Sequence, residues 1–306
     1  MQRLPVIIEA AINGMTSKKR NPATPKLPGE LISDALRCID AGASIIHLHA
    51  SSFEISVERA IDEYALIFAE ILRERPDAIL YPTGLAGKSM SERMGHFFKL
   101  AEMGLISMGY FDPGSVNLAA EQDANGLPIG GVTYVNSFDD CREMLGALSV
   151  QRIAPSIAIY EPGFLLVVLA YARAGKLPHG AMVKFYFGGE FSPFTGNRAI
   201  THGLPPTPPS LDALLAMYGA CPLPWGVGVF GGDIGRSSVL PFALALGGPV
   251  RVGLEDFCGE RVPTNIELIE EVVSLARTVG RKPATPQECA HILQIPRFNG
   301  KLPSQL

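Results

Sequence analysis

The sequence lacks the cysteine and charge patterns that would assign it to several large classes of protein. Its five cysteines are scattered, are odd in number and include no Cys-x-x-Cys pair. This usage argues against a disulfide framework and a zinc ribbon, and it fits a reducing compartment. Basic residues are not in excess, because the net charge is −4, so the chain carries no electrostatic footprint for nucleic acid.

Long hydrophobic runs are also absent from the sequence. The longest apolar run, 164–172, has about half of the ~20 residues that a membrane-spanning helix needs. The segment 1–11 lacks the charged start, the apolar stretch and the small-residue cleavage site of a signal peptide. We therefore expect a soluble, cytoplasmic protein that engages neither membranes nor nucleic acid.

What the chain does contain is a large apolar fraction and a regular alternation of strand-like and helix-like segments. Hydrophobic residues make up 47% of the 306 and charged residues 18%, as in a globular chain with a large core. The period-2 and period-3.6 patterns predict the elements that follow. The expected strands are 6–12, 43–50, 78–82, 105–109, 153–160, 182–187, 225–230 and 250–254, and the expected helices are 30–41, 56–75, 89–103, 137–149, 163–175, 210–218, 237–246, 264–280 and 285–293.

This alternation predicts the fold. Strand–helix–strand units are right-handed and form parallel sheets, and eight of them in about 300 residues indicate a closed (β/α)8 TIM barrel of the α/β class. We expect one barrel domain over 1–306, with a short helical extension at its C-terminal end. A doubly wound open sheet would show a glycine-rich phosphate-binding motif after its first strand, and Asn13-Gly14-Met15 is not one. Two segments, 110–131 and 188–209, are expected to be long loops.

Two histidines stand at the end of the second expected strand. His47 and His49 are two residues apart, so both imidazoles point to the same face of the strand. A single histidine in an apolar strand is usually a hydrogen-bonded core residue, but a pair must find partners for all its ring nitrogens. The pair alone is equally consistent with two hydrogen-bonded core histidines and with a metal site. The metal site is suggested by analogy with other His-x-His ligand pairs.

A group of charged residues stands at the end of the eighth expected strand. Arg251, Gly253 and Glu255 share one face by the two-residue period, and Asp256 follows them. In a closed barrel the second and eighth strands both flank the first, so Glu255 and the histidine pair can converge above it. Two histidines and one carboxylate with open positions are a catalytic zinc arrangement. The alternative for the charged residues is a structural ion-pair network at the barrel rim.

The other four histidines are expected to be ordinary. His96 and His291 fall on helices, and His179 lies at the opposite end of the barrel. His202, in the long loop after the sixth strand, could approach the mouth of the barrel. An amidohydrolase does not fit, because that class places its histidine pair after the first strand and adds further histidines on strands five and six.

Several motifs, in their order along the chain, resemble the β-keto acid cleavage enzymes, whose type member is 3-keto-5-aminohexanoate cleavage enzyme. The resemblance runs nearly from end to end. The His-x-His and Arg-Val-Gly-x-Glu-Asp motifs, together and in this order, are its most specific part. The matching segments are 10–14, 41–49, 82–84, 114–117, 160–163, 247–256 and 284–286.

The resemblance implies a zinc-dependent (β/α)8 acyltransferase, usually a homo-oligomer such as a dimer or tetramer. Such an enzyme condenses a β-keto acid with acetyl-CoA and releases acetoacetate and a new acyl-CoA. The resemblance places zinc, which manganese or cobalt could replace, on His47, His49 and Glu255, and it assigns the work of the base to Arg251 and Asp256. The positions it associates with substrate are Asn13, Thr16, Thr83, Gly84, Ser115, Asn117 and Glu161, and Arg236 is its candidate for cofactor binding.

The chemistry that the resemblance implies is physically coherent. A divalent cation can bind the keto oxygen and the carboxylate of a β-keto acid, and it then stabilises the enolate formed at the carbon between them. A nearby carboxylate takes the proton, and a fixed arginine orients that carboxylate. The enolate attacks the acetyl thioester, the released CoA attacks the former keto carbon, and a retro-Claisen step separates the products.

The chain departs from the type member on the expected fifth strand. Ser156 and Ala158 stand where the type member carries carboxylates that suit an ammonium-bearing substrate. Thr16 aligns with a pocket glutamate, and Pro82 replaces a serine. These differences predict a substrate that is not an aminated keto acid.

Other interpretations stay open at this point. A metal-dependent aldolase or lyase could use the same enolate without CoA, and a catalytically silent barrel could bind a metabolite. Lys18, Lys19, Arg20 and Lys26 in the first loop could screen CoA phosphates, although a solvated charged loop is the favoured interpretation.

Overall fold

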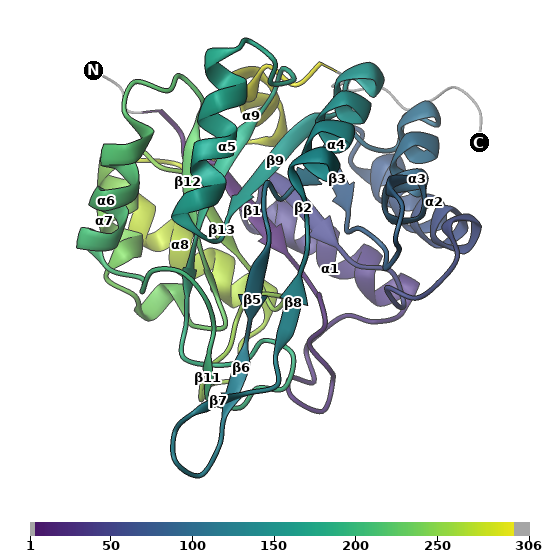
Figure 1. Cartoon of the computed structure of the whole chain (residues 1–306). Helices are drawn as coiled ribbons and strands as arrows, with labels where there is room; N and C mark the ends of the chain where they lie inside the picture. The colour runs from purple at the N-terminus through teal and green to yellow at the C-terminus, as the bar shows by residue number, and fades with distance from the viewer. Residues whose placement is uncertain (1–3, 297–306) are drawn as a thin grey trace.

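Eight parallel strands form the centre of the protein, whose computed structural model describes residues 4–296 (Figure 1). They are β1 (Ile8–Ala11), β2 (Ile45–Leu48), β3 (Ile79–Pro82), β4 (Met108–Phe111), β9 (Ala154–Ile159), β10 (Met182–Gly188), β12 (Trp225–Phe230) and β13 (Val250–Val252). Their order in the sheet is β3-β2-β1-β13-β12-β10-β9-β4, and β3 also lies beside β4, so the sheet nearly closes. The predicted barrel is confirmed, with β1 between β2 and β13.

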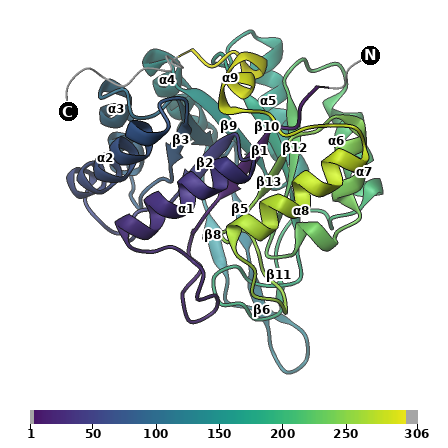
Figure 2. The same ribbon diagram turned by 180° about the vertical axis from the view of Figure 1, so that it is seen from behind.

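Helices follow the strands and surround the barrel (Figure 2). They are α1 (Pro28–Ala41), α2 (Val57–Glu74), α3 (Met90–Glu102), α4 (Phe138–Gln151), α5 (Pro162–Arg173), α6 (Pro208–Tyr218), α7 (Val239–Leu246), α8 (Asn265–Thr278) and α9 (Pro286–Leu293). Ser56 and Thr264 are the N-caps of α2 and α8, because each side chain accepts a hydrogen bond from a backbone N–H in the first turn. Within residues 4–296, no helix combines the length and the apolar character that crossing a bilayer requires.

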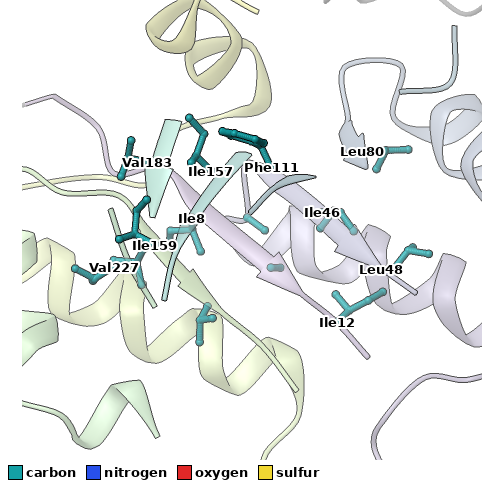
Figure 3. Packing of buried hydrophobic residues seen from close by; sticks show 14 of the residues in the cluster. Ile8, Ile12, Ile46, Leu48, Leu80, Phe111, Ile157, Ile159, Val183 and Val227 are labelled. Carbon is teal, nitrogen blue, oxygen red and sulfur yellow. The ribbon is translucent and has the colours of Figure 1, made fainter. Parts of the chain in front are cut away.

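Alternation along the strands separates two kinds of interior. Outward residues of the barrel, such as Ile8, Ile46 and Val183, pack under the helices in one apolar cluster (Figure 3). Inward residues at the amino ends of the strands, such as Ile45 and Ile79, pack against α9 in a second cluster, so α9 closes that end. Between this apolar floor and the carboxyl ends, the inward positions carry polar and charged side chains.

The prediction that 110–131 and 188–209 are plain loops is wrong. The first segment and the residues after it hold β5 (Val116–Leu118), β6 (Ala120–Gln122), β7 (Pro128–Ile129) and β8 (Val132–Tyr134), and the second holds β11 (Ala199–Ile200). β5 pairs with β8, while β6 joins β7 and β11, and these small sheets extend away from the barrel at the bottom of Figure 1. Strands of two or three residues are too short to show a period, which is why the sequence did not reveal them.

Candidate metal and substrate site

Three potential metal ligands converge at the carboxyl ends of the strands. His47 lies in β2, His49 follows it, and Glu255 follows β13 on the other side of β1. Glu255 Oε2 lies 3.3 Å from His47 Nε2 and 3.2 Å from His49 Nε2. One donor atom from each residue lies within 4.8 Å of the other two, so the structure brings together the predicted set.

The donor atoms fit a divalent cation. Both ring nitrogens of His49 and Oε2 of Glu255 are buried and lack a hydrogen-bond partner among the described residues. An unsatisfied buried polar atom costs about 1–3 kcal/mol, which a bound cation would offset. His47 Nδ1 lies 3.2 Å from the carbonyl oxygen of Tyr81, which favours a proton on Nδ1 and leaves the Nε2 lone pair facing Glu255.

Electrostatics favour the metal-binding protonation states. Burial lowers the pKa of His47 to about 4, despite the opposing effect of Glu255, so this imidazole is neutral at neutral pH. Burial by itself would raise the pKa of Glu255, but His49 and Arg251 outweigh it and hold that pKa well below its usual range. A neutral imidazole and an ionised carboxylate are the forms that bind zinc.

Two glycines allow the backbone near Glu255 to approach β1. Gly14 has φ +47°, and a Cβ there would lie 2.3 Å from Glu255 Cγ. Gly253 has φ +146°, and a Cβ there would lie 2.1 Å from the carbonyl oxygen of Ala11. Any larger residue at either position would therefore displace the segment that carries Glu255.

Arg251 is saturated by protein acceptors. Its Nε and Nη2 donate to Asp256 (2.8 and 3.4 Å), and Nη2 also donates to Glu255 Oε1 at 2.7 Å. Nη1 donates to Glu9 at 2.7 Å and to the Tyr81 hydroxyl at 3.1 Å. Since a guanidinium has five N–H groups, no donor is left for a substrate, and Arg251 serves to hold its carboxylates.

Asp256 is the carboxylate that Arg251 orients. It is buried, and burial raises its pKa to about 6 although Arg251 opposes the shift. A pKa near the working pH suits a general base.

A buried layer of charge beneath these residues was missed by the sequence-based prediction. Glu9 Oε1 accepts hydrogen bonds from Lys184 Nζ at 2.8 Å and from the Tyr81 hydroxyl at 2.5 Å, and Oε2 accepts one from Ser156 at 3.2 Å. Burial would raise the pKa of Glu9, but Lys184 and Arg251 lower it to about 2. A single acid in the apolar run 6–12 and a single lysine inside 182–187 were the clues in the sequence.

A cavity of about 610 Å³ opens above this layer. Its polar wall includes the predicted ligands and Arg251, together with Thr83, Gly84 and Lys184. Most of the remaining wall is aromatic or aliphatic. The aromatic part includes Tyr110, Tyr134, Tyr160, Tyr186, Phe194 and Phe230. The small sheets contribute to this wall, since Tyr134 belongs to β8 and Leu118 to β5.

Two predicted substrate residues contact the backbone of the segments that carry the candidate ligands, and their role with substrate stays a prediction. The Asn13 side chain donates to the His49 carbonyl oxygen at 3.0 Å and accepts from the His49 backbone N–H at 2.8 Å. The Thr16 hydroxyl donates to the Leu254 carbonyl oxygen at 2.6 Å, next to Glu255. Both fix the backbone at or beside a candidate metal ligand.

Ser115 and Asn117 lie at the base of the small sheets. The Ser115 hydroxyl donates to the Asn136 carbonyl oxygen at 3.1 Å, and Asn117 is an exposed residue of β5 that accepts from Thr133 at 3.0 Å. Neither is among the described residues that line the cavity. A role for them in substrate binding stays a prediction.

Glu161 and Arg236 also lie outside the cavity wall. Glu161 is the N-cap of α5 and accepts a hydrogen bond from the Gly203 backbone N–H at 2.9 Å. Arg236 is exposed in the short 3₁₀ helix η1 (Ile234–Arg236) and borders a separate cavity of about 410 Å³. Their predicted roles with substrate and cofactor are not supported by contact with the larger cavity, and they stay predictions.

The histidine in the long loop does not line the larger cavity. His202 stands behind its aromatic wall, with its ring 5.1 Å from that of Tyr160 and 5.7 Å from that of Phe230.

In the first loop, Lys18 pairs with Glu30 at 2.5 Å, and Lys26 donates to the Gly14 carbonyl oxygen at 3.0 Å. Lys18 and Lys26 therefore interact with other residues of this chain, as the interpretation of a charged surface loop expects.

The fold and site define a barrel enzyme whose pocket is lined by two histidines, a glutamate and an arginine, and the arginine holds a buried aspartate behind the cavity wall. The chain belongs to the β-keto acid cleavage enzyme family, whose model matches residues 5–295.

Characterised relatives share nearly the whole length of the chain. A 3-keto-5-aminohexanoate cleavage enzyme from Acetoanaerobium sticklandii is 27% identical over 297 residues, covering 95% of this chain and 98% of the relative. A 3-dehydrocarnitine:acetyl-CoA trimethylamine transferase from Rhizobium meliloti is 25% identical, covering 95% and 96%. A 3-oxoadipate:acetyl-CoA acetyltransferase from Cupriavidus necator is 25% identical, covering 98% and 99%.

Solved structures support the fold. The apo structure of ObcA superposes with a TM-score of 0.63 at 14% identity, covering 90% of this chain. The chain spans 66% of the length of that structure. At this identity the likeness concerns the fold alone.

Proposed function

We propose that the protein is a zinc-dependent β-keto acid cleavage enzyme that condenses a β-keto acid with acetyl-CoA to give acetoacetate and an acyl-CoA. The observation that carries this proposal is the convergence of His47, His49 and Glu255 at one wall of the cavity, beside the Arg251–Asp256 pair. Family membership supports the reaction type, and two relatives named for acetyl-CoA support the second substrate.

The metal ligands would be the two imidazoles and the carboxylate. His47, His49 and Glu255 would hold a zinc ion, which when bound supplies Lewis-acid polarisation of the keto carbonyl. Arg251 holds one oxygen of Glu255 and leaves the other facing the histidines. Tyr81 and Asn13 fix the orientation of the histidine segment.

Asp256 is the proposed base. It takes the proton from the carbon between the keto and carboxylate groups, and Arg251 keeps its carboxylate oriented. The deprotonated carbon forms a bond to the acetyl carbonyl carbon, and the C–S bond of acetyl-CoA breaks. The released CoA thiolate then bonds to the former keto carbon, the old C–C bond breaks, and the carbon that leaves regains a proton as acetoacetate.

The test is a panel of β-keto acids incubated with acetyl-CoA, with acetoacetate and the new acyl-CoA measured together by mass spectrometry. We expect both products in equal amounts, and we expect the His47→Ala variant to form neither. Cleavage that proceeds without acetyl-CoA would replace this proposal with an aldolase or lyase, and a purified protein without stoichiometric zinc would contradict the metal assignment.

The proposal extends to the setting of the enzyme. We propose a homo-oligomer, either a dimer or a tetramer, that works in the cytoplasm. Light scattering of the purified full chain tests the first part, and cell fractionation tests the second.

A further inference from the structure

Lys184 occupies the middle of the barrel. It lies in β10, its side chain is about 4% exposed, and it borders the cavity. Nζ donates to Glu9 Oε1 at 2.8 Å and to the Tyr81 hydroxyl at 3.1 Å. It also lies 5.6 Å from the centre of the Tyr186 ring. A lysine this deeply buried is rare, and here only one carboxylate pairs with it directly.

The Lys184 ammonium group keeps one donor for a ligand. An ammonium carries three N–H groups, and Glu9 and Tyr81 accept two of them. Among the described residues no third acceptor lies within hydrogen-bond distance, and the group borders open space. Arg251, the other cation of this layer, has no donor left, so the two cations differ in what they can offer to a substrate.

The neighbouring strand β9 provides no acceptor for the third N–H of Lys184. Ala158 of β9 pairs in register with Lys184, and Ser156, two residues earlier, donates its hydroxyl to Glu9. Neither position carries a carboxylate that could accept a hydrogen bond from Lys184. With a small apolar residue and a hydroxyl there instead, the charge of Lys184 is directed toward the cavity.

Besides Glu255, one further carboxylate borders the same cavity and has to be weighed. Asp112 borders the cavity, and its Oδ2 accepts a hydrogen bond from the Tyr134 hydroxyl at 2.8 Å. No ion pair of Asp112 within 4.0 Å is present among residues 4–296. Burial raises the pKa of Asp112 to about 6, with Tyr134 and Lys184 opposing the shift, so it carries its charge less readily than an exposed aspartate.

We propose that Lys184 is a specificity-determining residue that binds a second carboxylate, located on the substituent of the β-keto acid, so that the substrate is a β-keto dicarboxylic acid. The first carboxylate of this substrate would lie at the metal ligands, and the second would accept the free N–H of Lys184. The inference rests on the proposed function, and it agrees with the loss of the carboxylates that suit an aminated substrate.

The test compares three β-keto acids of equal length whose substituents end in a carboxylate, a methyl group or an ammonium group. With acetyl-CoA we expect the highest kcat/KM for the carboxylate. In Lys184→Met the ratio of kcat/KM for carboxylate over methyl should fall about 10- to 100-fold, mainly through KM, because one charge-assisted hydrogen bond is lost. A purely structural role would lower both substrates equally and leave the ratio unchanged, which would overturn the inference.

Asp112→Asn is the matched variant for the competing carboxylate. We expect it to leave the preference for the dicarboxylic substrate in place or to increase it. Preference for the ammonium-ended acid in the wild type, lost in Asp112→Asn, would assign specificity to Asp112 and overturn the role of Lys184. If Lys184→Met fails to fold, the Glu9→Gln/Lys184→Met double variant removes both charges of the pair. The ratio of kcat/KM for the carboxylate-ended over the methyl-ended acid is then measured in this double variant.

A binding measurement separates this inference from the proposed reaction. Calorimetry with an unreactive saturated dicarboxylic acid and the monocarboxylic acid of equal length needs no turnover. We expect the zinc-loaded wild type to bind the dicarboxylic acid at least tenfold more tightly, and Lys184→Met to bind the two equally. If no keto acid is turned over but the difference in binding is observed, only the proposed reaction is wrong. If the methyl-ended acid is turned over but the wild type binds the two acids equally, only the role of Lys184 is wrong.

Discussion

At the residue scale, the site depends on buried polar atoms that have no hydrogen-bond partner among residues 4–296. His49 is the clearest case, since neither of its ring nitrogens has a hydrogen-bond partner among the described residues. We expect His49→Ala to lose bound zinc and to lower kcat/KM at least about 100-fold, because the ion would keep only two protein ligands. Metal analysis of the purified variant gives the zinc content, and His179→Ala, an exposed histidine outside the site, is the control. Full zinc occupancy in His49→Ala would contradict the assignment.

Gly14 gives a second prediction at this scale. In Gly14→Ala the new Cβ would meet Glu255 Cγ at 2.3 Å in a backbone of φ +47°, so the Glu255 side chain must leave its present position. We expect zinc affinity to fall about tenfold or more, as for residues that orient metal ligands. The matched control is Gly29→Ala in α1, where a Cβ meets nothing within 4 Å. Competition with a zinc-sensitive dye measures both affinities, and equal values would show that Glu255 tolerates the shift.

Most of the candidate metal site could be predicted from the sequence, and the layer beneath it could not. His47, His49 and Glu255 stand at strand ends with a regular period, so the barrel order alone brings them together. Glu9 and Lys184 stand singly inside apolar strands, and their meeting depends on how far each side chain crosses the barrel. Strand period gives the direction of a side chain and does not give its reach.

At the scale of elements, helix termini contribute measurably to stability. Thr264 caps α8, since its hydroxyl accepts from the Glu267 backbone N–H at 3.2 Å and Glu267 accepts from the Thr264 N–H at 2.7 Å. We expect Thr264→Ala to lower the free energy of unfolding by about 1 kcal/mol, because the reciprocal bonds are lost. Ser238→Ala is the control, since the Ser238 side chain makes no capping bond to α7. Urea denaturation measures both, and equal losses would contradict a specific capping role.

The elements were predictable where they were long and periodic. Helix α2 and strand β12 lie where the sequence places them, because each has a clear period and a clear boundary. The fourth strand begins at Met108 and not at 105, because Leu105 and Ile106 are buried residues of the irregular segment that precedes it. Burial alone does not distinguish a strand from a packed turn.

At the scale of the whole molecule, the sign of a pKa shift sets how stability depends on pH. His96 is fully buried in α3, and its Nε2 lies 2.8 Å from the Thr83 carbonyl oxygen. Burial lowers the pKa of His96 from 6.5 to about 4 in the folded chain. The unfolded chain therefore takes up the proton first as the pH falls. The neutral form favours the fold fully above pH ~6.5, and this contribution is lost progressively toward pH ~4.

We therefore expect the protein to lose stability in mild acid in a way that His96 partly determines. Between pH 7 and pH 5 the linkage for this one group amounts to about 2 kcal/mol of unfolding free energy. The His96→Gln variant should be less stable at pH 7, because a buried contact changes, yet it should lose less stability on going to pH 5. Urea denaturation at both pH values measures the free energy of unfolding of each protein. The difference between wild type and variant removes the contribution of the candidate metal ligands, which both proteins share. His291→Gln, at an exposed position on α9, should follow the wild type at both pH values. If the wild type and His96→Gln lose the same free energy of unfolding between pH 7 and pH 5, protonation of His96 does not contribute to this loss, and the prediction is wrong.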